Sequence, residues 1–383
     1  MPISLLIGFW LGILQLPDAS LPFQFELKQH DGTSVMIIHN AEERIICDEV
    51  TMQGDSIFIK LPLYDSEFRL KVGNESLTGN WYNYGRKLPT SIPFTATKNI
   101  EHRFPVSSQV SSPILLEGSW ETWFDAGTPD SSLAIGQFKR NGNKVFGTFL
   151  TESGDHRYLE GVIDQDSLKL SVFDGTHAYL YLAKVQGEEM QGMYYAGNSY
   201  KAPFRARKNN SIKLRDPSTL TQATGEINFR LPDIDSNMIS LTDVGYRHHV
   251  KIIQLFGTWC PNCMDESIFL DSVYSARKEE GLTIFGLAFE RSPDFNTAKK
   301  GVAKMQKRLN IHYPLLIAGS TKKGDVQKIL PVIQNFFSYP TTLFVDRKGN
   351  VIKVHSGFSG PATGEEWEKY KFDFNRTLDR LLR

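Results

Sequence analysis

The chain has 383 residues, and its 43 basic and 43 acidic side chains give a formal net charge of zero. Hydrophobic residues make up 40% and charged residues 22% of the chain, which is typical of a globular protein with two or three domains. No basic run favours a nucleic-acid partner, and three cysteines are too few for a disulfide-stapled framework.

An apolar run from Ile3 to Leu16 opens the chain. The run is too short to span a membrane comfortably, and the small residues Ala19 and Ser20 follow it. We therefore expect residues 1–20 to be a signal peptide that exports the protein to the periplasm or cell envelope. No Lys or Arg precedes the run, and Pro17 interrupts the cleavage region, so a buried N-terminal strand is the alternative interpretation.

Apolar and polar residues alternate, with frequent turn residues, from Phe23 to about Lys208. Short strands at this spacing are typical of an antiparallel all-β sandwich or barrel. Cys47 follows two isoleucines in this region and is interpreted as a core residue. The strands that we predict include residues 23–27, 56–61, 68–72, 134–138, 144–149, 158–163, 167–173, 177–185 and 189–195.

A weak internal repeat divides this β region. A Gly-x-aromatic strand is followed, after a loop, by Pro-Phe-x-Ala-x-Lys, first within residues 79–98 and again within residues 192–208. We therefore expect two related β units, over residues 21–110 and 111–208. A polar stretch with a proline then predicts a linker over residues 209–224.

Two polar loop tips, Gly154–Arg157 and Asp174–His177, each contain an Asp and a His. We interpret them as solvated hairpin turns rather than as a metal site. The aromatic residues Trp120, Trp123 and Phe124 are interpreted as core rather than as a ligand platform. A binding module for an unknown ligand remains one hypothesis for the β region.

The pattern changes in residues 225–383, where predicted strands alternate with predicted helices. Such alternation favours an α/β domain with a mixed sheet and helices on both faces. The predicted strands cover residues 250–256, 283–289, 313–317, 341–346 and 351–355, and the predicted helices cover residues 261–280, 292–309, 325–330 and 365–382.

Cys260 and Cys263 stand where the first of these strands passes into a helix. The N–H groups and partial positive charge at a helix N-terminus stabilise a thiolate, and Pro261 suits the first helical position. We expect Cys260 to cap the helix and be exposed, with Cys263 one turn behind it. A zinc site would need further ligands, and the only other cysteine is Cys47, so a redox dithiol is favoured without a metal or cofactor.

Three features together carry a family resemblance. They are Trp259–Cys263 with the sequence WCPNC, the Tyr339–Asp346 segment with the sequence YPTTLFVD, and Glu266 three residues after the second cysteine. Residues 225–383 thereby resemble the thioredoxin fold, and more closely the exported TlpA/ResA-like thiol–disulfide reductases. The wider sequence is similar to redoxins of Bacteroidetes type, which carry an extra N-terminal β region.

The resemblance implies a redox disulfide between Cys260 and Cys263. In this scheme Cys260 is the attacking thiolate, Cys263 resolves the mixed disulfide, and Glu266 accepts the proton of Cys263. Thioredoxin has a buried aspartate where this chain has Gln254, so the proton relay falls to Glu266. Gly257 occupies the position at which peroxiredoxins require a threonine, which counts against peroxidase activity.

The resemblance also implies how a substrate binds. We expect Trp259 to shield the dithiol, a cis Pro340 to face it, and the backbone of Tyr339 to pair with an extended substrate. Gly357 and Phe358, after the last strand, are expected to shape the groove. The implied partners are a disulfide-containing protein substrate and a membrane thiol reductant. Disulfide oxidase or isomerase activity is the alternative, because the sequence does not set the redox potential.

Overall fold

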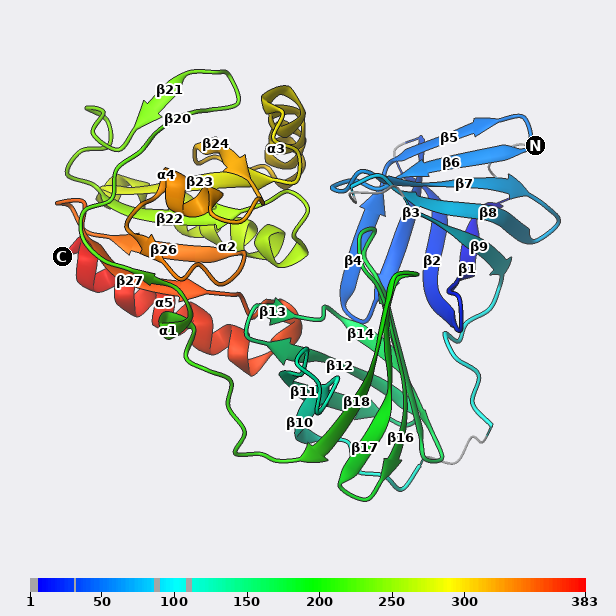
Figure 1. Cartoon of the computed structure of the whole chain (residues 1–383). Helices are drawn as coiled ribbons and strands as arrows, with labels where there is room; N and C mark the ends of the chain where they lie inside the picture. Colours follow the sequence, from blue (N-terminus) through cyan, green and yellow to red (C-terminus); the bar gives the residue numbers. More distant parts are fainter. Residues whose placement is uncertain (1–5, 31, 86–89, 108–111) are drawn as a thin grey trace. The chain divides into compact units, whose positions relative to one another are not determined.

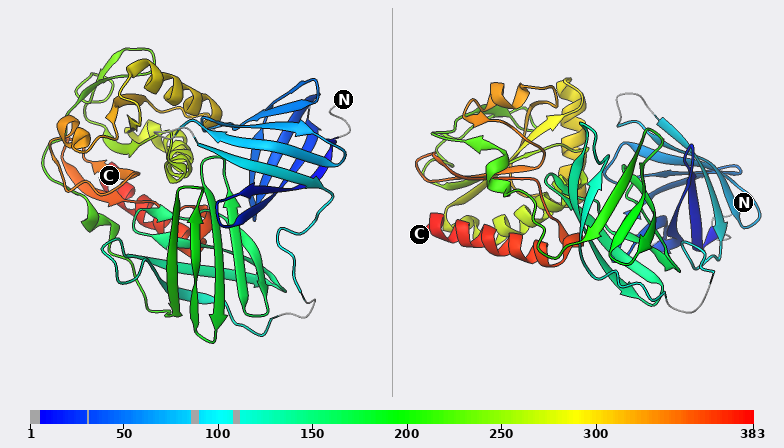
Figure 2. Two further views of the ribbon diagram at one scale, coloured as in Figure 1. Left: turned by 45° about the vertical axis from the view of Figure 1, so that its right-hand side comes forward. Right: turned by 60° about the horizontal axis from the view of Figure 1, so that its bottom comes forward.

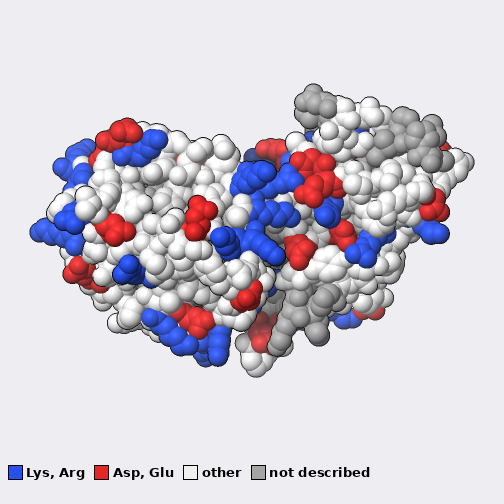
Figure 3. Space-filling model, turned by 90° about the horizontal axis from the view of Figure 1, so that it is seen from above, with Lys and Arg blue, Asp and Glu red and all other residues white. Residues whose placement is uncertain are grey.

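The structure is a computed structural model that describes residues 6–30, 32–85, 90–107 and 112–383. The chain divides into two compact units (Figure 1). The first unit comprises Met1–Thr151 and His156–Lys213, and the second comprises Glu152–Asp155 and Leu214–Arg383. Basic and acidic side chains lie interspersed over the face shown in Figure 3.

The first sheet of the first unit has nine antiparallel strands among the described residues. Its strand order is β4-β3-β2-β1-β9-β8-β7-β6-β5. The strands are β1 (Gly8–Gln15), β2 (Ser20–His30), β3 (Thr33–Asn40), β4 (Glu43–Cys47), β5 (Glu49–Gln53), β6 (Ser56–Lys60), β7 (Ser66–Val72), β8 (Ser76–Asn83) and β9 (Thr90–Lys98).

The second sheet of the first unit is strongly curved (Figure 1). Its strand order is β11-β10-β18-β17-β16-β15-β14-β12-β13. An additional pairing of β11 with β12 closes its strands into a barrel. The strands are β10 (Gly118–Phe124), β11 (Ser132–Asn141), β12 (Lys144–Thr151), β13 (Gly154–Asp155), β14 (Leu159–Asp164), β15 (Ser167–Phe173), β16 (Ala178–Gln186), β17 (Glu189–Ala196) and β18 (Tyr200–Lys208).

Period-two burial explains why these segments form strands. In β9, Ile92, Phe94 and Ala96 are buried, while the residues between them are exposed. The inward aromatic residues fill the core, and Phe23 and Phe68 lie against Phe94 with ring centroids 5.7 and 4.8 Å away. The predicted antiparallel all-β fold is therefore confirmed for this part of the chain.

The two sheets contain equivalent tryptophans. Trp10 in β1 pairs with Lys98 of β9, and Trp120 in β10 pairs with Lys208 of β18. Each indole N–H donates to the carbonyl four residues earlier, at 2.9 Å for Trp10 and 2.8 Å for Trp120. The paired lysine ammonium lies 6.0 Å from the Trp10 ring and 5.7 Å from the Trp120 ring. Strand β1 is thus the counterpart of β10 in a structural repeat.

The expectation of a signal peptide at residues 1–20 disagrees with this arrangement. Residues 8–15 are the strand β1, which pairs with β2 on one side and β9 on the other. Trp10 and Leu14 are fully buried. The apolar run therefore forms part of the core, which is the alternative interpretation of the same residues.

The expectation of solvated tips at residues 154–157 and 174–177 is also wrong. Asp174 is 3% exposed, and its carboxylate accepts the backbone N–H groups of Thr176 at 2.9 Å and His177 at 2.6 Å. Asp155 is 6% exposed. Turn residues can satisfy their own backbone and then pack, so their polarity alone does not place them in solvent.

The second unit contains a mixed five-stranded sheet with the order β24-β23-β22-β26-β27. Strands β22, β23 and β24 are parallel, and β26 and β27 are antiparallel to their neighbours. The strands are β22 (Val250–Phe256), β23 (Leu282–Glu290), β24 (Leu315–Ser320), β26 (Thr341–Val345) and β27 (Val351–Ser356). The helices are α1 (Pro217–Leu220), α2 (Pro261–Arg277), α3 (Phe295–Leu309), α4 (Asp325–Ile329) and α5 (Glu365–Leu382).

Helices cover both faces of this sheet, which confirms the predicted α/β class. Phe269 of α2 packs on Phe374 of α5, with ring centroids 5.0 Å apart, so these two helices share one face. Val326 of α4 belongs to the core on the opposite face, together with Leu255 and Leu287. Figure 2 shows α5, in red, as a long helix beside the sheet. Within the described residues, no helix is long and apolar enough to cross a membrane.

The residues expected to form a linker, 209–224, are partly structured. They contain α1 and the short strand β19 (Gln222–Ala223), which pairs with β25 (Ile333–Gln334). Thr221 is fully buried, and its hydroxyl accepts the Ser356 hydroxyl at 2.6 Å. A further small sheet joins β20 (Arg230–Pro232) to β21 (Met238–Ser240).

The structural repeat predicts that β1 stabilises the mature protein. Replacing a fully buried tryptophan by alanine removes its apolar contacts and leaves a cavity, which costs about 3–5 kcal/mol. We expect Trp10→Ala and Trp120→Ala each to lower the free energy of unfolding by this amount, measured by urea unfolding of the purified protein. Normal stability of Trp10→Ala beside a destabilised Trp120→Ala would show that β1 is not part of the mature fold.

Candidate active site

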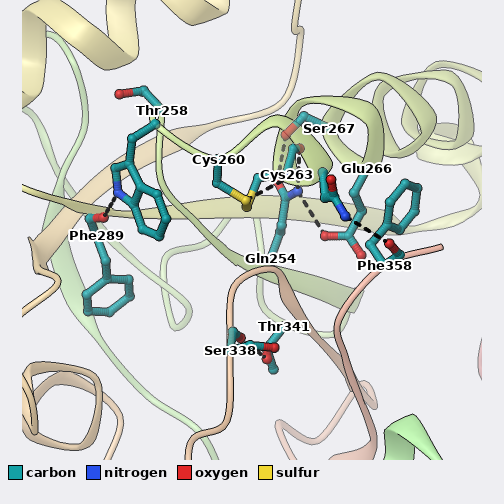
Figure 4. The surroundings of a disulfide bond; sticks show 12 residues. Gln254, Thr258, Cys260, Cys263, Glu266, Ser267, Phe289, Ser338, Thr341 and Phe358 are labelled. Atoms are coloured by element: carbon teal, nitrogen blue, oxygen red, sulfur yellow. Dashed lines mark hydrogen bonds between the residues drawn. A yellow bond between two sulfur atoms is a disulfide. The ribbon is translucent and has the colours of Figure 1, made fainter. Parts of the chain in front are cut away.

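The dithiol lies at the N-terminus of α2 (Figure 4). Cys260 and Cys263 form a disulfide with a Cα–Cα distance of 5.2 Å. Cys260 is the N-cap residue, and its sulfur accepts the backbone N–H of Cys263 at 3.2 Å. Pro261 follows in the first turn, where its missing N–H leaves no bond unmade. After reduction, the same N–H groups and helix dipole would stabilise a Cys260 thiolate.

The expectation that Cys260 is exposed is wrong in this oxidised state. Cys260 is 7% exposed and Cys263 is fully buried. Asn262, between the cysteines, is 9% exposed. The first turn of α2 is buried because side chains and loops of the same unit pack over it, so only a small part of Cys260 faces solvent.

The end of β23 holds the turn that precedes the dithiol. The Glu290 carboxylate accepts the backbone N–H and the hydroxyl of Thr258, each at 2.8 Å. The Phe289 carbonyl accepts the Trp259 indole N–H at 3.0 Å, and the Arg291 guanidinium lies 5.0 Å from the Trp259 ring centroid. Three consecutive residues thus fix the backbone and the aromatic ring beside Cys260.

Glu290 was not identified from the sequence. The residue is 7% exposed, and its burial raises the pKa of its carboxyl group above the usual value. One signal was available, because Glu290 ends β23, the parallel neighbour of β22. The carboxyl ends of parallel strands meet at one edge of a sheet, and β22 leads directly into the dithiol turn.

Glu266 lies fully buried behind the dithiol. Its carboxylate accepts hydrogen bonds from Gln254 Nε2 at 2.9 Å, Thr342 Oγ1 at 2.7 Å and the Tyr370 hydroxyl at 3.0 Å. Burial raises the pKa of Glu266 to about 7, although the three donors act in the opposite direction. The carboxyl group can therefore take up or release a proton near neutral pH.

Gln254 connects Glu266 to the second cysteine. Its Nε2 also donates to the Cys263 carbonyl, at 3.3 Å. Its Oε1 accepts the Ser267 hydroxyl at 3.0 Å and the Tyr313 hydroxyl at 3.2 Å. These two donors orient the amide so that its N–H groups face Glu266 and Cys263, as Figure 4 shows for the residues it labels.

The segment expected to face the dithiol has a cis peptide bond between Tyr339 and Pro340. The Pro340 carbonyl accepts the backbone N–H of Gly357 at 2.8 Å, which joins this loop to the loop after β27. The Tyr339 ring meets the Trp259 ring edge-on, with centroids 5.6 Å apart. Both aromatic side chains are half-buried, so they lie at the surface of the site.

Gly357 and Phe358, expected to shape the substrate groove, are buried. The Phe358 ring is 2% exposed and lies 5.5 Å from the Trp367 ring and 5.0 Å from the Tyr370 ring, measured between centroids. Its carbonyl accepts Nδ2 of Asn262 at 3.3 Å. The structure thus brings Phe358 to the dithiol helix through its backbone, while its side chain packs on α5.

Known proteins resemble the second unit. Residues 222–369 match the Redoxin family. The thiol–disulfide oxidoreductase ResA of Halalkalibacterium halodurans is 25% identical over 131 residues, which are 34% of this chain and 66% of that protein. ResA of Bacillus thuringiensis is 27% identical over 143 residues, which are 37% of this chain and 72% of that protein. The chain therefore spans about two thirds of the length of these relatives.

Solved structures also match only part of this chain. A thiol:disulfide interchange protein of the thioredoxin family from Chlorobium tepidum is 23% identical, with a TM-score of 0.33, and covers 42% of this chain and 98% of its own. A second Chlorobium tepidum protein, described as a putative thiol:disulfide interchange protein DsbE, is 15% identical with a TM-score of 0.33 and covers 42% of this chain.

Glu266 predicts a pH dependence of stability. In the folded protein its pKa is about 7, whereas the ordinary value is 4.5, so the folded state holds an extra proton between these values. The free energy of unfolding should then fall as pH rises from about 4.5 to about 7, by up to about 1.4 kcal/mol per pH unit, and level off above pH 7. Urea unfolding at several pH values would measure this slope, and Glu266→Gln should flatten it.

The exposed Glu279, in the short 3-10 helix Lys278–Glu280 that follows α2, provides a matched control. Glu279→Gln should keep the wild-type slope, because this side chain is exposed and lies outside the Glu266 hydrogen-bond network. A Glu266→Gln protein that retained the full slope would assign the pH dependence to another group.

Proposed function

We propose that this chain, whose residues 222–369 form a redoxin domain of the TlpA/ResA type, is a thiol–disulfide oxidoreductase. One observation carries the proposal. The Cys260 sulfur caps a helix and accepts its N–H, and a buried carboxyl group with a pKa of about 7 lies one turn beyond Cys263. A nucleophilic thiolate and a proton acceptor for its partner are the two groups that disulfide exchange requires.

The proposed reaction begins with the dithiol in its reduced form. The Cys260 thiolate attacks one sulfur of a substrate disulfide and forms a mixed disulfide, while the other substrate sulfur leaves as a thiolate and takes a proton from water. The Cys263 thiol then gives its proton to the Glu266 carboxylate, which accepts a hydrogen bond from Gln254. The Cys263 thiolate attacks the Cys260 sulfur and the second substrate sulfur leaves as a thiolate, which takes a proton from water. The protein is left as the Cys260–Cys263 disulfide, oxidised by two electrons.

Trp259 and Tyr339 are the proposed contacts for the substrate. Their half-buried rings flank the dithiol, and the backbone at Tyr339 precedes the cis peptide bond. An extended segment of a disulfide-containing protein would pair with this backbone as an added strand. Pro340 and Gly357 hold the loop in place through their backbone hydrogen bond.

The proposed direction is reduction of protein disulfides in the cell envelope, with a membrane thiol reductant as the electron donor. The resemblance to TlpA/ResA-like reductases supports both the direction and the location. Burial of Cys263 also supports the reducing direction. A buried resolving thiol is protected from oxidation until the mixed disulfide forms.

The dithiol chemistry is tested with two serine variants. Cys260→Ser should abolish reduction of insulin by the dithiothreitol-reduced protein, because no attacking thiolate remains. Cys263→Ser should accumulate mixed disulfides with substrate proteins, seen as reducible adducts on gels. Cys47→Ala, which alters a fully buried residue of β4, should leave insulin reduction unchanged. Full insulin reduction by Cys260→Ser would refute the assignment.

The direction is tested by the equilibrium potential of the dithiol in glutathione or dithiothreitol buffers. A value near about −270 mV is expected for a reductase, whereas a value near about −120 mV would make the protein an oxidant. The alkylated fraction of Cys260 and Cys263, measured by mass spectrometry, reports the potential directly.

A further inference from the structure

Four residues of the second unit come from the middle of the β region. Residues 152–155 lie in the sequence between β12 and β14, yet they belong to the same compact unit as the dithiol. We call them the 152–155 segment. Its strand β13 (Gly154–Asp155) is buried, unlike Ser153, which is exposed. The segment therefore packs within the second unit rather than pointing into solvent.

Two glycines permit a close approach between this segment and the dithiol region. Gly154 has a φ of +155°, and a Cβ there would lie 1.8 Å from Nδ2 of Asn262. Gly357 has a φ of +77°, and a Cβ there would lie 2.3 Å from the Glu152 carbonyl oxygen. A larger residue at Gly154 would displace the Asn262 side chain, and one at Gly357 would push its backbone away from that of Glu152.

Buried hydrogen bonds complete the contact. Nδ2 of Asn262 donates to the Asp155 carbonyl at 3.4 Å, in addition to its bond with Phe358. The Asp155 carboxylate accepts the backbone N–H of Gly360 at 2.8 Å. Asp155 is 6% and Asn262 is 9% exposed, so these bonds are shielded from water.

An ion pair fixes the beginning of the segment. The Arg215 Nε donates to the Glu152 carboxylate at 2.6 Å. The Arg215 guanidinium also lies 5.5 Å from the ring of Phe337, two residues before Tyr339. The segment is thereby tied to both loops that neighbour the dithiol, the one before Pro340 and the one after β27.

We propose that the 152–155 segment positions the dithiol, with Asp155 as the positioning residue. It holds Asn262, which stands between the two cysteines, and the loop at Gly360 in one arrangement. Asn262 belongs to the first turn of α2, whose N–H groups and dipole stabilise the Cys260 thiolate. Loosening this turn lowers the thiolate fraction at neutral pH. The inference rests on the proposed function, because it concerns the reactivity of the same dithiol.

The test measures the pH dependence of Cys260 alkylation by iodoacetamide in the reduced, full-length protein. Asp155→Ala removes the acceptor for Gly360, and Gly154→Ala pushes the segment off Asn262. We expect both variants to raise the midpoint of the alkylation profile by about one pH unit, which is about tenfold less thiolate below the midpoint. Asp155→Asn should retain the wild-type midpoint, because its amide oxygen still accepts the Gly360 N–H.

Gly142→Ala is the matched control. Gly142 also has a positive φ, of +61°, in a hairpin of the β region, but a Cβ there would meet nothing within 4 Å. This variant should keep the wild-type alkylation profile even if it loses some stability. A wild-type midpoint in folded Asp155→Ala would overturn the proposal.

A measurement on the unaltered protein covers the case in which Asp155→Ala does not fold. The Gly360 amide should exchange its hydrogen slowly, because the buried Asp155 carboxylate accepts it. Exchange as fast as that of an open loop would overturn the proposal. Failure of the wild-type protein to reduce insulin would instead refute the proposed function and leave the alkylation comparison readable.

Discussion

The site depends on the burial of one carboxyl group. The carboxylate of Glu266, in α2, accepts hydrogen bonds from Gln254 of β22, Thr342 of β26 and Tyr370 of α5. Three other elements of the second unit therefore meet α2 at this one side chain. A buried charge is costly unless hydrogen bonds stabilise it, and here three donors partly offset that cost. The balance leaves a pKa of about 7, and the same bonds fix the helix that presents the cysteines.

The sequence predicted the α/β unit well, because its helices and strands have strong periodicity and clear ends. The expected helix over residues 365–382 coincides with α5, and the strand predicted over 283–289 differs from β23 only at its ends. The N-terminal run was harder to interpret, because an apolar stretch has the same composition in a signal peptide and in a buried strand. The spacing from Trp10 to Phe94, repeated from Trp120 to Phe204, distinguishes the two. The repeat recognised in the sequence includes Phe94 and Phe204 but does not extend to the two tryptophans.

Motif spacing located the cysteines, Glu266 and Pro340, because these residues lie close to the dithiol in sequence or in a recognisable segment. Asp155 and Glu290 were missed for a different reason. Each reaches the site through tertiary packing from a distant part of the chain, and Asp155 stands in a turn-like sequence that is usually solvated. Residue type and local pattern therefore identify the groups proposed to react better than the groups proposed to position them.

Gln254 keeps a second carboxyl group away from Glu266. Thioredoxin has a buried aspartate at this position, and an aspartate here would stand close to Glu266, whose Oε2 lies 2.9 Å from Nε2 of Gln254. Two carboxylates at such a distance share one proton, so neither titrates independently. The neutral amide avoids this coupling and donates to Glu266 and to the Cys263 carbonyl at once. In the proposed mechanism, proton transfer from Cys263 therefore falls to Glu266 alone, on the same helix as the thiol.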